Sequence, residues 1–308
     1  MIAVTVVLAL LAALSNASAS VLQRRAAVEQ PDEGTGARAA GRRLLQLLRR
    51  PSWLAGAGLL ALSSLLQAGA LATGSLSLVQ PLLAAELLFT LAVGSVVFRR
   101  RPDGRTWLAF AALAVGLALF LLAAAPSPGR PTAPPEAWLL GGCGALGAVV
   151  VLVAVSRPVR GAARAALLGL ASAVSFATTA ALMKEAVGRL AIGPEAMFTH
   201  WSLYATAGAG LVAFLLLQSA LSAGSLTASQ PALTLGDALT SVVLGWVLFD
   251  ETIHLGLRVI PEVIGVVLIG AGSIGLAHAQ AAGQDWDTSV PDRPPDRNGR
   301  RAPAPRRP

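Results

Sequence analysis

Long apolar stretches alternate with short polar segments along the whole chain. Each stretch holds about twenty residues, the length that a helix needs to cross the hydrocarbon core of a bilayer. The pattern predicts an all-α fold, a polytopic membrane helix bundle of about nine transmembrane helices. They are expected at about 2–22, 53–73, 76–98, 106–125, 137–155, 163–187, 198–219, 222–249 and 257–278.

The composition supports this prediction. Hydrophobic residues make up 55% of the chain, and Asp, Glu, Lys and Arg together make up 13%. Soluble domains carry about a quarter of charged residues. A soluble fold with this composition would expose an apolar surface that water does not tolerate. We therefore expect an integral membrane protein.

The basic residues test the number of spans. With the N-terminus outside and the C-terminus in the cytoplasm, 20 of the 24 Lys and Arg residues fall on cytoplasmic segments. The four that fall outside are Arg130, Lys184, Arg189 and Arg258. The positive-inside rule requires such a bias. The net charge of +8 therefore describes a cytoplasmic face that meets anionic lipid head groups, and no compact basic domain exists to bind nucleic acid.

Other counts indicate a bacterial plasma membrane. Arg outnumbers Lys by 23 to 1 and Ala is abundant, as in proteins of GC-rich bacterial genomes. Cys143 is the single cysteine, so no disulfide forms within the chain. Stripes of small residues such as Gly265 to Gly275 serve general helix packing or a homodimer seam.

A sequence repeat organises the chain. Gly-Ser-Leu at 74–76 followed by Gln-Pro at 80–81 recurs at 224–226 and 230–231, with an offset of 150 residues. The first and sixth spans correspond at an offset of 160, which aligns Arg24 with Lys184. Spans one to four thus match spans six to nine. Five crossings separate equivalent helices, an odd number, so the two copies are predicted to be inverted relative to each other.

The predicted organisation follows from this repeat. The first repeat covers 1–125 with a cytoplasmic loop at 23–52, and a linking fifth span covers 126–160. The second repeat covers 161–280. A disordered cytoplasmic tail rich in Pro and Arg is expected at 281–308.

Each copy carries an acidic residue near the middle of a span, Glu86 in the first and Asp237 in the second. A carboxylate at mid-bilayer costs roughly 2.5–3.5 kcal/mol on insertion scales, so it usually faces a polar path or a partner. Both acids are expected to face one central cavity, where each would take up a proton, bind a cation or contact a substrate ammonium group. The alternative is a neutral acid that is hydrogen-bonded between helices.

Polar and helix-perturbing residues accompany the acids. Pro81 and Pro231 free a backbone carbonyl inside a span, and such carbonyls can line a cavity. The adjacent Gln80 and Gln230 offer a donor and an acceptor to a substrate. The alternative is a kink that only fits helix shapes together.

Charged residues at the outer ends of spans are a second group of candidates. Lys184 is expected either to balance Glu185 or to line an external vestibule. Asp250 and Glu251, at the end of the eighth span, are expected to be solvated. The chain contains none of the catalytic motifs tested, such as a zinc-protease, nucleophile-elbow or phosphate-loop signature, so no enzyme activity and no resident cofactor are expected.

The run from Gly74 through Pro81 to Phe98, and its second copy from Ala223 to Glu251, resemble the drug/metabolite transporter superfamily with its EamA-like repeats. In that family a Pro opens the helix that ends at an acidic residue before the last span, as from Pro231 to Glu251. In the first copy, Arg99–Arg101 stands in place of that acid. Nine spans rather than ten look most like the NIPA-like magnesium transporters of the superfamily. That resemblance implies Mg²⁺ with Glu86 and Asp237 among its ligands.

The sequence therefore predicts a secondary transporter that moves a small polar or cationic solute by alternating access. Glu86, Asp237, Gln80, Gln230 and Lys184 are its expected substrate-binding residues, and either a proton or Mg²⁺ would serve as coupling ion or substrate. One alternative is a NIPA-like Mg²⁺ transporter. The other is a non-transporting membrane scaffold subunit.

Overall fold

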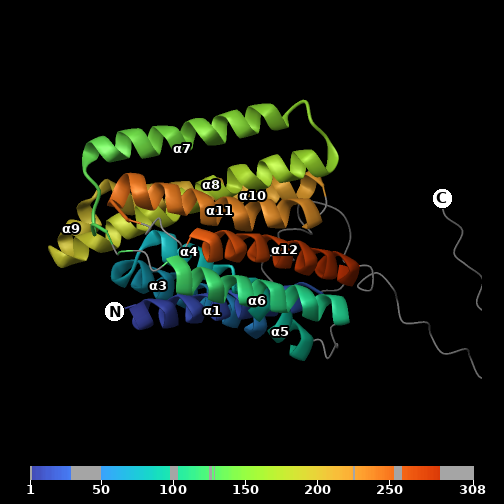
Figure 1. The fold of residues 1–308 in the computed structure, drawn as a ribbon. Coiled ribbons are helices and arrows are strands. Elements are labelled where there is room, and N and C mark those ends of the chain that lie inside the picture. The colour runs from blue at the N-terminus through green and yellow to red at the C-terminus, as the bar shows by residue number, and fades with distance from the viewer. Residues whose placement is uncertain are drawn as a thin grey trace, which may run out of the picture.

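A computed structural model of the chain describes residues 2–28, 50–97, 103–124, 127, 129–224, 226–252 and 259–284. Within these residues the chain forms helices and turns and no strand, which confirms the all-α prediction. The elements, drawn in Figure 1, are α1 (Ile2–Val28), α3 (Pro51–Thr73), α4 (Leu76–Leu83), α5 (Glu86–Val97), α6 (Gly104–Ala124), α7 (Pro135–Ser156), α8 (Gly161–Gly188), the 3₁₀ turn η1 (Arg189–Ala191), α9 (Pro194–Thr199), α10 (Trp201–Ala223), α11 (Leu226–Phe249) and α12 (Val259–Gln284).

Eight helical segments of the described chain are long and apolar enough to cross a membrane, as expected of a multi-pass membrane protein. One of them, Leu76–Val97, is built from α4 and α5 together. In α12 the apolar segment is shorter, Val263–His278, so the ninth crossing stays a prediction. Residues 281–284 belong to the end of α12 rather than to a tail. The rest of the predicted tail, and most of the predicted loop at 23–52, lie outside the described residues.

Local chemistry marks where several helices begin. Proline occupies the first position of α3, α7 and α9, where its missing N–H costs no helical hydrogen bond. Asp103 caps α6, because its carboxylate accepts the side-chain hydroxyl and the backbone N–H of Thr106, the latter at 2.9 Å. These hydrogen bonds from Thr106 lower the pKa of Asp103 below its usual range.

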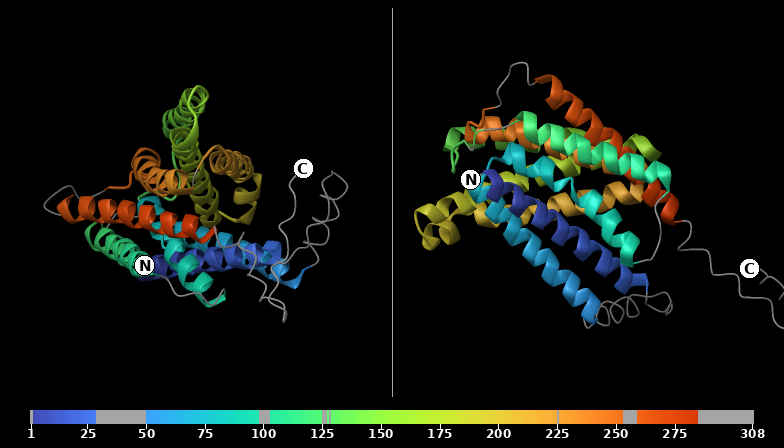
Figure 2. Two further views of the ribbon diagram at one scale, coloured as in Figure 1. Left: turned by 90° about the vertical axis from the view of Figure 1, so that its right-hand side faces the viewer. Right: turned by 60° about the horizontal axis from the view of Figure 1, so that its bottom comes forward.

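The helices pack in two similar groups. In one group α1 lies against α3 (Figure 2, right) and against α4 and α5. In the other, α8 lies against α10 and α11. The helix between the groups, α7, packs mainly against α8 and projects from the rest of the bundle (Figure 1).

The two groups are joined at the close contact of α6 with α12. A Cβ atom on Gly116 would lie 2.7 Å from the backbone nitrogen of Ile269 and 2.8 Å from the carbonyl oxygen of Gly265. Only glycine permits backbones to approach this closely. The order of contacts, Gly116 on Gly265 and Ala109 on Gly275, makes the two helices antiparallel.

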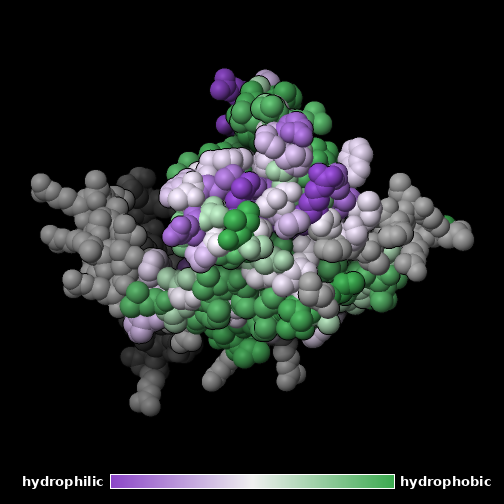
Figure 3. All heavy atoms as spheres, turned by 90° about the vertical axis from the view of Figure 1, so that its left-hand side faces the viewer, coloured by the Kyte–Doolittle hydropathy of each residue, from purple (hydrophilic) through white to green (hydrophobic). Residues whose placement is uncertain are grey.

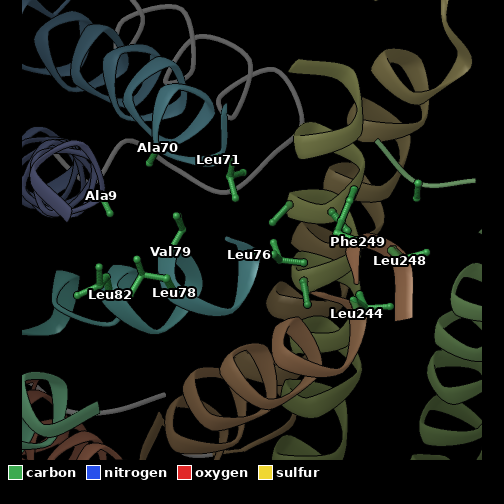
Figure 4. Packing of buried hydrophobic residues seen from close by; sticks show 14 residues of the cluster. Ala9, Ala70, Leu71, Leu76, Leu78, Val79, Leu82, Leu244, Leu248 and Phe249 are labelled. Atoms are coloured by element: carbon green, nitrogen blue, oxygen red, sulfur yellow. The ribbon is translucent and has the colours of Figure 1, made fainter. Parts of the chain in front are cut away.

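Two clusters of buried apolar residues form the core. The first lies where α1, α3, α4, α8 and α11 converge (Figure 4). The second lies between α1, α5, α6 and α12. Because α4 contributes to the first cluster and α5 to the second, the crossing that these two helices form together lies at the centre of the bundle.

Several of the polar contacts between segments lie at one end of the bundle. Thr5, near the start of α1, hydrogen-bonds to Thr73 at the end of α3, with 3.0 Å between the hydroxyl oxygens. The end of α11 reaches the same place, and Arg130 pairs there with Asp250 at 2.8 Å. Figure 3 looks onto this end, and polar side chains gather on it above an apolar lower part. We call it the outer end, because the predicted topology puts it outside the membrane.

Candidate functional site

Buried polar atoms without partners mark the facing helices α4 and α11. Gln80 Nε2 in α4, and Asp237 Oδ1 and Ser241 Oγ in α11, are buried and have no hydrogen-bond partner among the described residues. A buried polar atom left unpaired costs about 1–3 kcal/mol, so nearly all such atoms in proteins are paired. Three in one region are a reason to expect a polar ligand.

The contacts between α4 and α11 establish how these helices face each other. Near the outer end, a Cβ atom on Gly245 of α11 would lie 2.6 Å from the Ser77 hydroxyl of α4. Farther in, Pro81 shares a small apolar cavity of about 20 Å³ with Ala238 and Val242 of α11. The numbers rise on α4 as they fall on α11, so the two helices are antiparallel.

This register brings the three unpaired atoms together on one side. Pro81, Ala238 and Val242 line the contact between the two helices. Each is immediately preceded by one of the unpaired residues, which are Gln80, Asp237 and Ser241 in the same order. Successive side chains on a helix point about 100° apart. When two facing helices are antiparallel, the residues that precede the contact residues on each helix therefore point to the same side of the contact. The sequence-predicted pair Gln80 and Asp237 thus flanks one side of the contact, and Ser241 is a residue that the sequence analysis missed. Its spacing of four from Asp237 is the signal that would have found it.

The third crossing is broken just inside this site. Helix α4 ends at Leu83, and a turn at Ala84 and Ala85 leads into α5. Bonds of the i to i+3 type close the turn, with Ala84 N–H donating to Pro81 at 3.1 Å and Ala85 N–H donating to Leu82 at 3.0 Å. Pro81 lacks the N–H that would bind the carbonyl of Ser77. The proline predicted to perturb this span does lie beside a break.

Glu86 is the first residue of α5, immediately after the break. A carboxylate is favourable at this position because the N-terminus of a helix carries partial positive charge. Its side chain hydrogen-bonds to Asn16 of α1. The structure therefore gives Glu86 a partner on α1, whereas Asp237 lies on the α4 side of α11. The two acids were predicted to face one cavity, but their described contacts are separate.

The second copy differs from the first at its proline. Helix α11 runs unbroken from Leu226 to Phe249 although it contains Pro231. The predicted perturbation is therefore strong in one copy only. Gln230 is half-buried, and its backbone carbonyl accepts the hydroxyl of Thr234 at 3.1 Å.

Lys184 of α8 lies in a buried ion pair. Its Nζ atom is 2.5 Å from Glu251 Oε1, and the two side chains are 3% and 0% exposed. The same carboxylate accepts the backbone N–H groups of Leu76 at 2.6 Å and Ser77 at 2.9 Å, and the Ser77 hydroxyl at 2.5 Å. Lys184 also lies over the ring of Phe249, 4.6 Å from its centroid.

This geometry corrects two sequence-based expectations. Glu251 was expected to be solvated, but it is enclosed at the outer end of α11 and caps α4. Lys184 was expected to balance Glu185 or to line a vestibule, but it pairs with Glu251. Glu185 instead accepts Arg189 at 2.8 Å and the backbone N–H of Ala133 at 2.7 Å.

A second cavity, of about 580 Å³, lies between α7, α8 and α10 near the outer end. Trp138 and Trp201, which pack edge to face, line it together with Glu185, Arg189 and His200. Lys184 does not line it. Burial and the neighbouring Arg189 charge lower the pKa of His200, so its imidazole is neutral at pH 7.

The structure adds no acidic, histidine or cysteine ligand to Glu86 and Asp237, which the family resemblance implies as metal ligands, among the residues that it describes. Among the residues that the structure describes, no three His, Cys, Asp or Glu side chains are grouped so as to hold a metal ion. Oxygen ligands from carbonyls or hydroxyls would have to complete such a site.

Taken together, the helices and this site define a multi-pass membrane protein whose interior holds a buried ion pair and unpaired polar atoms between packed helices. No family model and no solved structure matches the chain. The chain is 30% identical over 252 residues to the uncharacterized protein Cgl0250/cg0304 of Corynebacterium glutamicum. The match covers 80% of this chain and 84% of the corynebacterial protein. The chain therefore belongs to the same family as that protein.

Proposed function

We propose that the protein is a secondary transporter in which a small polar or cationic solute binds between α4 and α11. The observation that carries this proposal is the group of buried unpaired atoms on Gln80, Asp237 and Ser241. A scaffold has no need for an ionisable side chain without a partner in its interior, because such a group destabilises the fold. A solute with donor groups would complete the hydrogen bonds of Asp237 and Ser241, and its acceptors would bind Gln80.

Matched contacts in the two groups of helices support an inverted repeat. The Ser63 hydroxyl of α3 donates to the Ala12 carbonyl of α1 at 2.9 Å, and the Ser172 hydroxyl of α8 donates to the Ala213 carbonyl of α10 at 2.8 Å. The positions correspond at the sequence offsets, because 12 and 172 differ by 160, and 63 and 213 differ by 150. The serine donor of one half stands where the other half has the carbonyl acceptor, but the same pair of corresponding positions is in contact in both halves.

A second pair of contacts repeats at the same offsets. A Cβ atom on Gly74 would collide with Thr5, and one on Gly224 would lie 3.0 Å from Ala165. The contact of Gly74 with Thr5 is at the outer end, whereas that of Gly224 with Ala165 belongs to the start of α8. Repeats of opposite orientation around a central site are the usual basis of alternating access.

Flux into proteoliposomes tests the proposal. Purified protein is reconstituted and offered a panel of small polar and cationic solutes with and without a proton gradient, and Mg²⁺ is one member of the panel. We expect saturable, protein-dependent uptake of at least one solute, lost in Asp237→Asn. Uptake that is unchanged in Asp237→Asn would remove the assignment of the site. No uptake of any solute, together with a stably bound partner protein, would favour the scaffold alternative.

A further inference from the structure

The buried ion pair at the outer end ties together three segments that are distant in sequence. Lys184 comes from α8, Glu251 follows α11, and the remaining donors belong to the first turn of α4. Helix α4 belongs to the first half of the chain, and α8 and α11 belong to the second. The carboxylate of Glu251 is thus the bond between the halves at this end.

The position of the ion pair is directly above the proposed solute site. Ser77 lies three residues from Gln80, which is about 4.5 Å along a helix. With side-chain exposures of 3% and 0%, the pair is enclosed between the outer end and the site. The backbone N–H of Arg130 donates to Phe249 at 2.7 Å, so the segment that precedes α7 closes over the same place.

A buried ion pair keeps its charges only while each has its partners, because desolvated charges are costly. Glu251 has four donors and Lys184 has the carboxylate and the Phe249 ring. Separating α4 from α8 would break most of these contacts at once. Opening at this point therefore requires these contacts to break together.

The repeat reveals what stands at the opposite end of the molecule. At the sequence offsets of 160 and 150, Lys184 corresponds to Arg24 and Glu251 corresponds to Arg101. Both of these are cations, so this pair of positions cannot form an ion pair. Arg101 lies outside the described residues, and the comparison here is one of sequence alone. In the sequence, the two positions that form the ionic contact in one copy are both occupied by arginine in the other.

We propose that Lys184, Glu251 and Ser77 form a gate, which closes the solute site from the outside, whereas the two corresponding positions of the first copy are both arginine in the sequence. The resting protein is closed outward, and outward opening requires Lys184 and Glu251 to separate. This inference rests on the proposed function, because a gate needs a site to enclose.

Cysteine labelling tests the gate without any transported solute. Cys143→Ser removes the single cysteine, which is exposed on α7, and Ser241→Cys then places a reporter in the site. Membrane-impermeant maleimide is applied to the full chain in right-side-out and inside-out vesicles. We expect slow labelling from the outside and faster labelling from the cytoplasmic side. Glu251→Gln should accelerate outside labelling at least about tenfold, the change that corresponds to about 1.4 kcal/mol of gate stability.

Matched variants separate the gate from general loosening. Asp250→Asn breaks the neighbouring pair with Arg130, whose side chains are 60% and 59% exposed, and should leave outside labelling unchanged. Ser77→Ala removes one hydrogen bond of the carboxylate and should give a smaller acceleration than Glu251→Gln. If Glu251→Gln does not fold, the acceleration of outside labelling in Ser77→Ala tests the gate instead.

Two results would overturn the gate. The first is that, with Lys184, Glu251 and Ser77 all intact, the reporter cysteine is labelled as fast from the outside as from the cytoplasmic side. The second is equal acceleration by Asp250→Asn and by the Glu251 or Ser77 variants. Because labelling needs no substrate, the two failures can be told apart: expected labelling with no uptake of any solute would refute the proposed transport and leave only a closed ionic contact at the outer end. The opposite pattern would refute the gate alone.

Discussion

The two halves of the molecule are alike in how α1 packs on α3, α4 and α5 and how α8 packs on α10 and α11, but they carry different residues at positions that correspond in the sequence. In the first half the crossing that contains Gln80 and Pro81 breaks into α4 and α5, whereas in the second half α11 passes Pro231 without a break. At the outer end Glu251 closes the second half onto the first, whereas the equivalent position in the first half is Arg101. Similar packing with dissimilar polar chemistry is what we expect if a repeat supplies the scaffold and its departures set the different roles of the halves.

The largest expected effect comes from removing one member of the ion pair. Glu251→Ala leaves the Lys184 ammonium buried without its carboxylate and α4 without its cap, and breaking a buried pair in this way costs about 3–5 kcal/mol. We expect a large decrease in the thermal unfolding temperature of the purified protein in detergent. Asp250→Ala, the exposed neighbour, is the control and should change the unfolding temperature little, because exposed ion pairs contribute roughly 0–1 kcal/mol. Equal shifts for the two variants would contradict the burial of Glu251.

The next effect distinguishes the two mid-span acids. Asp237→Asn removes the carboxyl group that lies without a partner between α4 and α11, so the residue can no longer become a carboxylate beside a bound cationic group, and a hydrogen bond to a charged group contributes about 1.5–3 kcal/mol. That range corresponds to roughly ten- to hundredfold weaker solute binding, measured as an increase in the KM of uptake.

Glu86→Gln is the matched variant in the first half. Because Glu86 already hydrogen-bonds to Asn16 and starts α5, its loss should lower stability more than solute affinity. If Glu86→Gln raises the KM as much as Asp237→Asn does, both acids belong to one site, as the sequence analysis predicted.

The seam between the halves should be sensitive to one added methyl group. Gly116→Ala or Gly265→Ala pushes the backbones of α6 and α12 apart, and overpacking of this kind costs about 1–3 kcal/mol. Gly94→Ala in α5 is the control, since a Cβ atom there meets nothing within 4 Å. The measurement is the unfolding temperature of the three variants. A shift in Gly94→Ala equal to that in Gly116→Ala would mean that helix α6 does not lie closely on α12.

Hydropathy predicts which residues enter the bilayer, and it predicted the helical segments of this fold well. It carries no information on which side chains meet across the bundle. Gln80 and Asp237 were found because a polar residue in an apolar run is conspicuous in itself. The partner of Lys184 was missed because Glu251 follows a helix by two residues, where an acid is ordinarily solvated. Only the approach of α4 to α8, which belong to different halves of the chain, turns that position into the interior. The sequence also could not predict that the helix breaks after Pro81 but continues past Pro231, because both prolines stand in identical Gln-Pro pairs.

The smallest effect gives the most direct comparison of the halves. The hydroxyls of Ser63 and Ser172 make interhelical hydrogen bonds at equivalent places, one within α1 and α3 and the other within α8 and α10. Such bonds contribute about 0.6 kcal/mol on average in membrane proteins. Ser63→Ala and Ser172→Ala should therefore lower the unfolding temperature by small and similar amounts, and the double variant should lower it by their sum, because the two sites are independent. Ser64→Ala is the control, since the exposed Ser64 hydroxyl bonds only within its own helix, to Leu60. A large loss in one of the two serine variants alone would mean that the halves, although alike in their contacts, differ in how strongly their helices hold together.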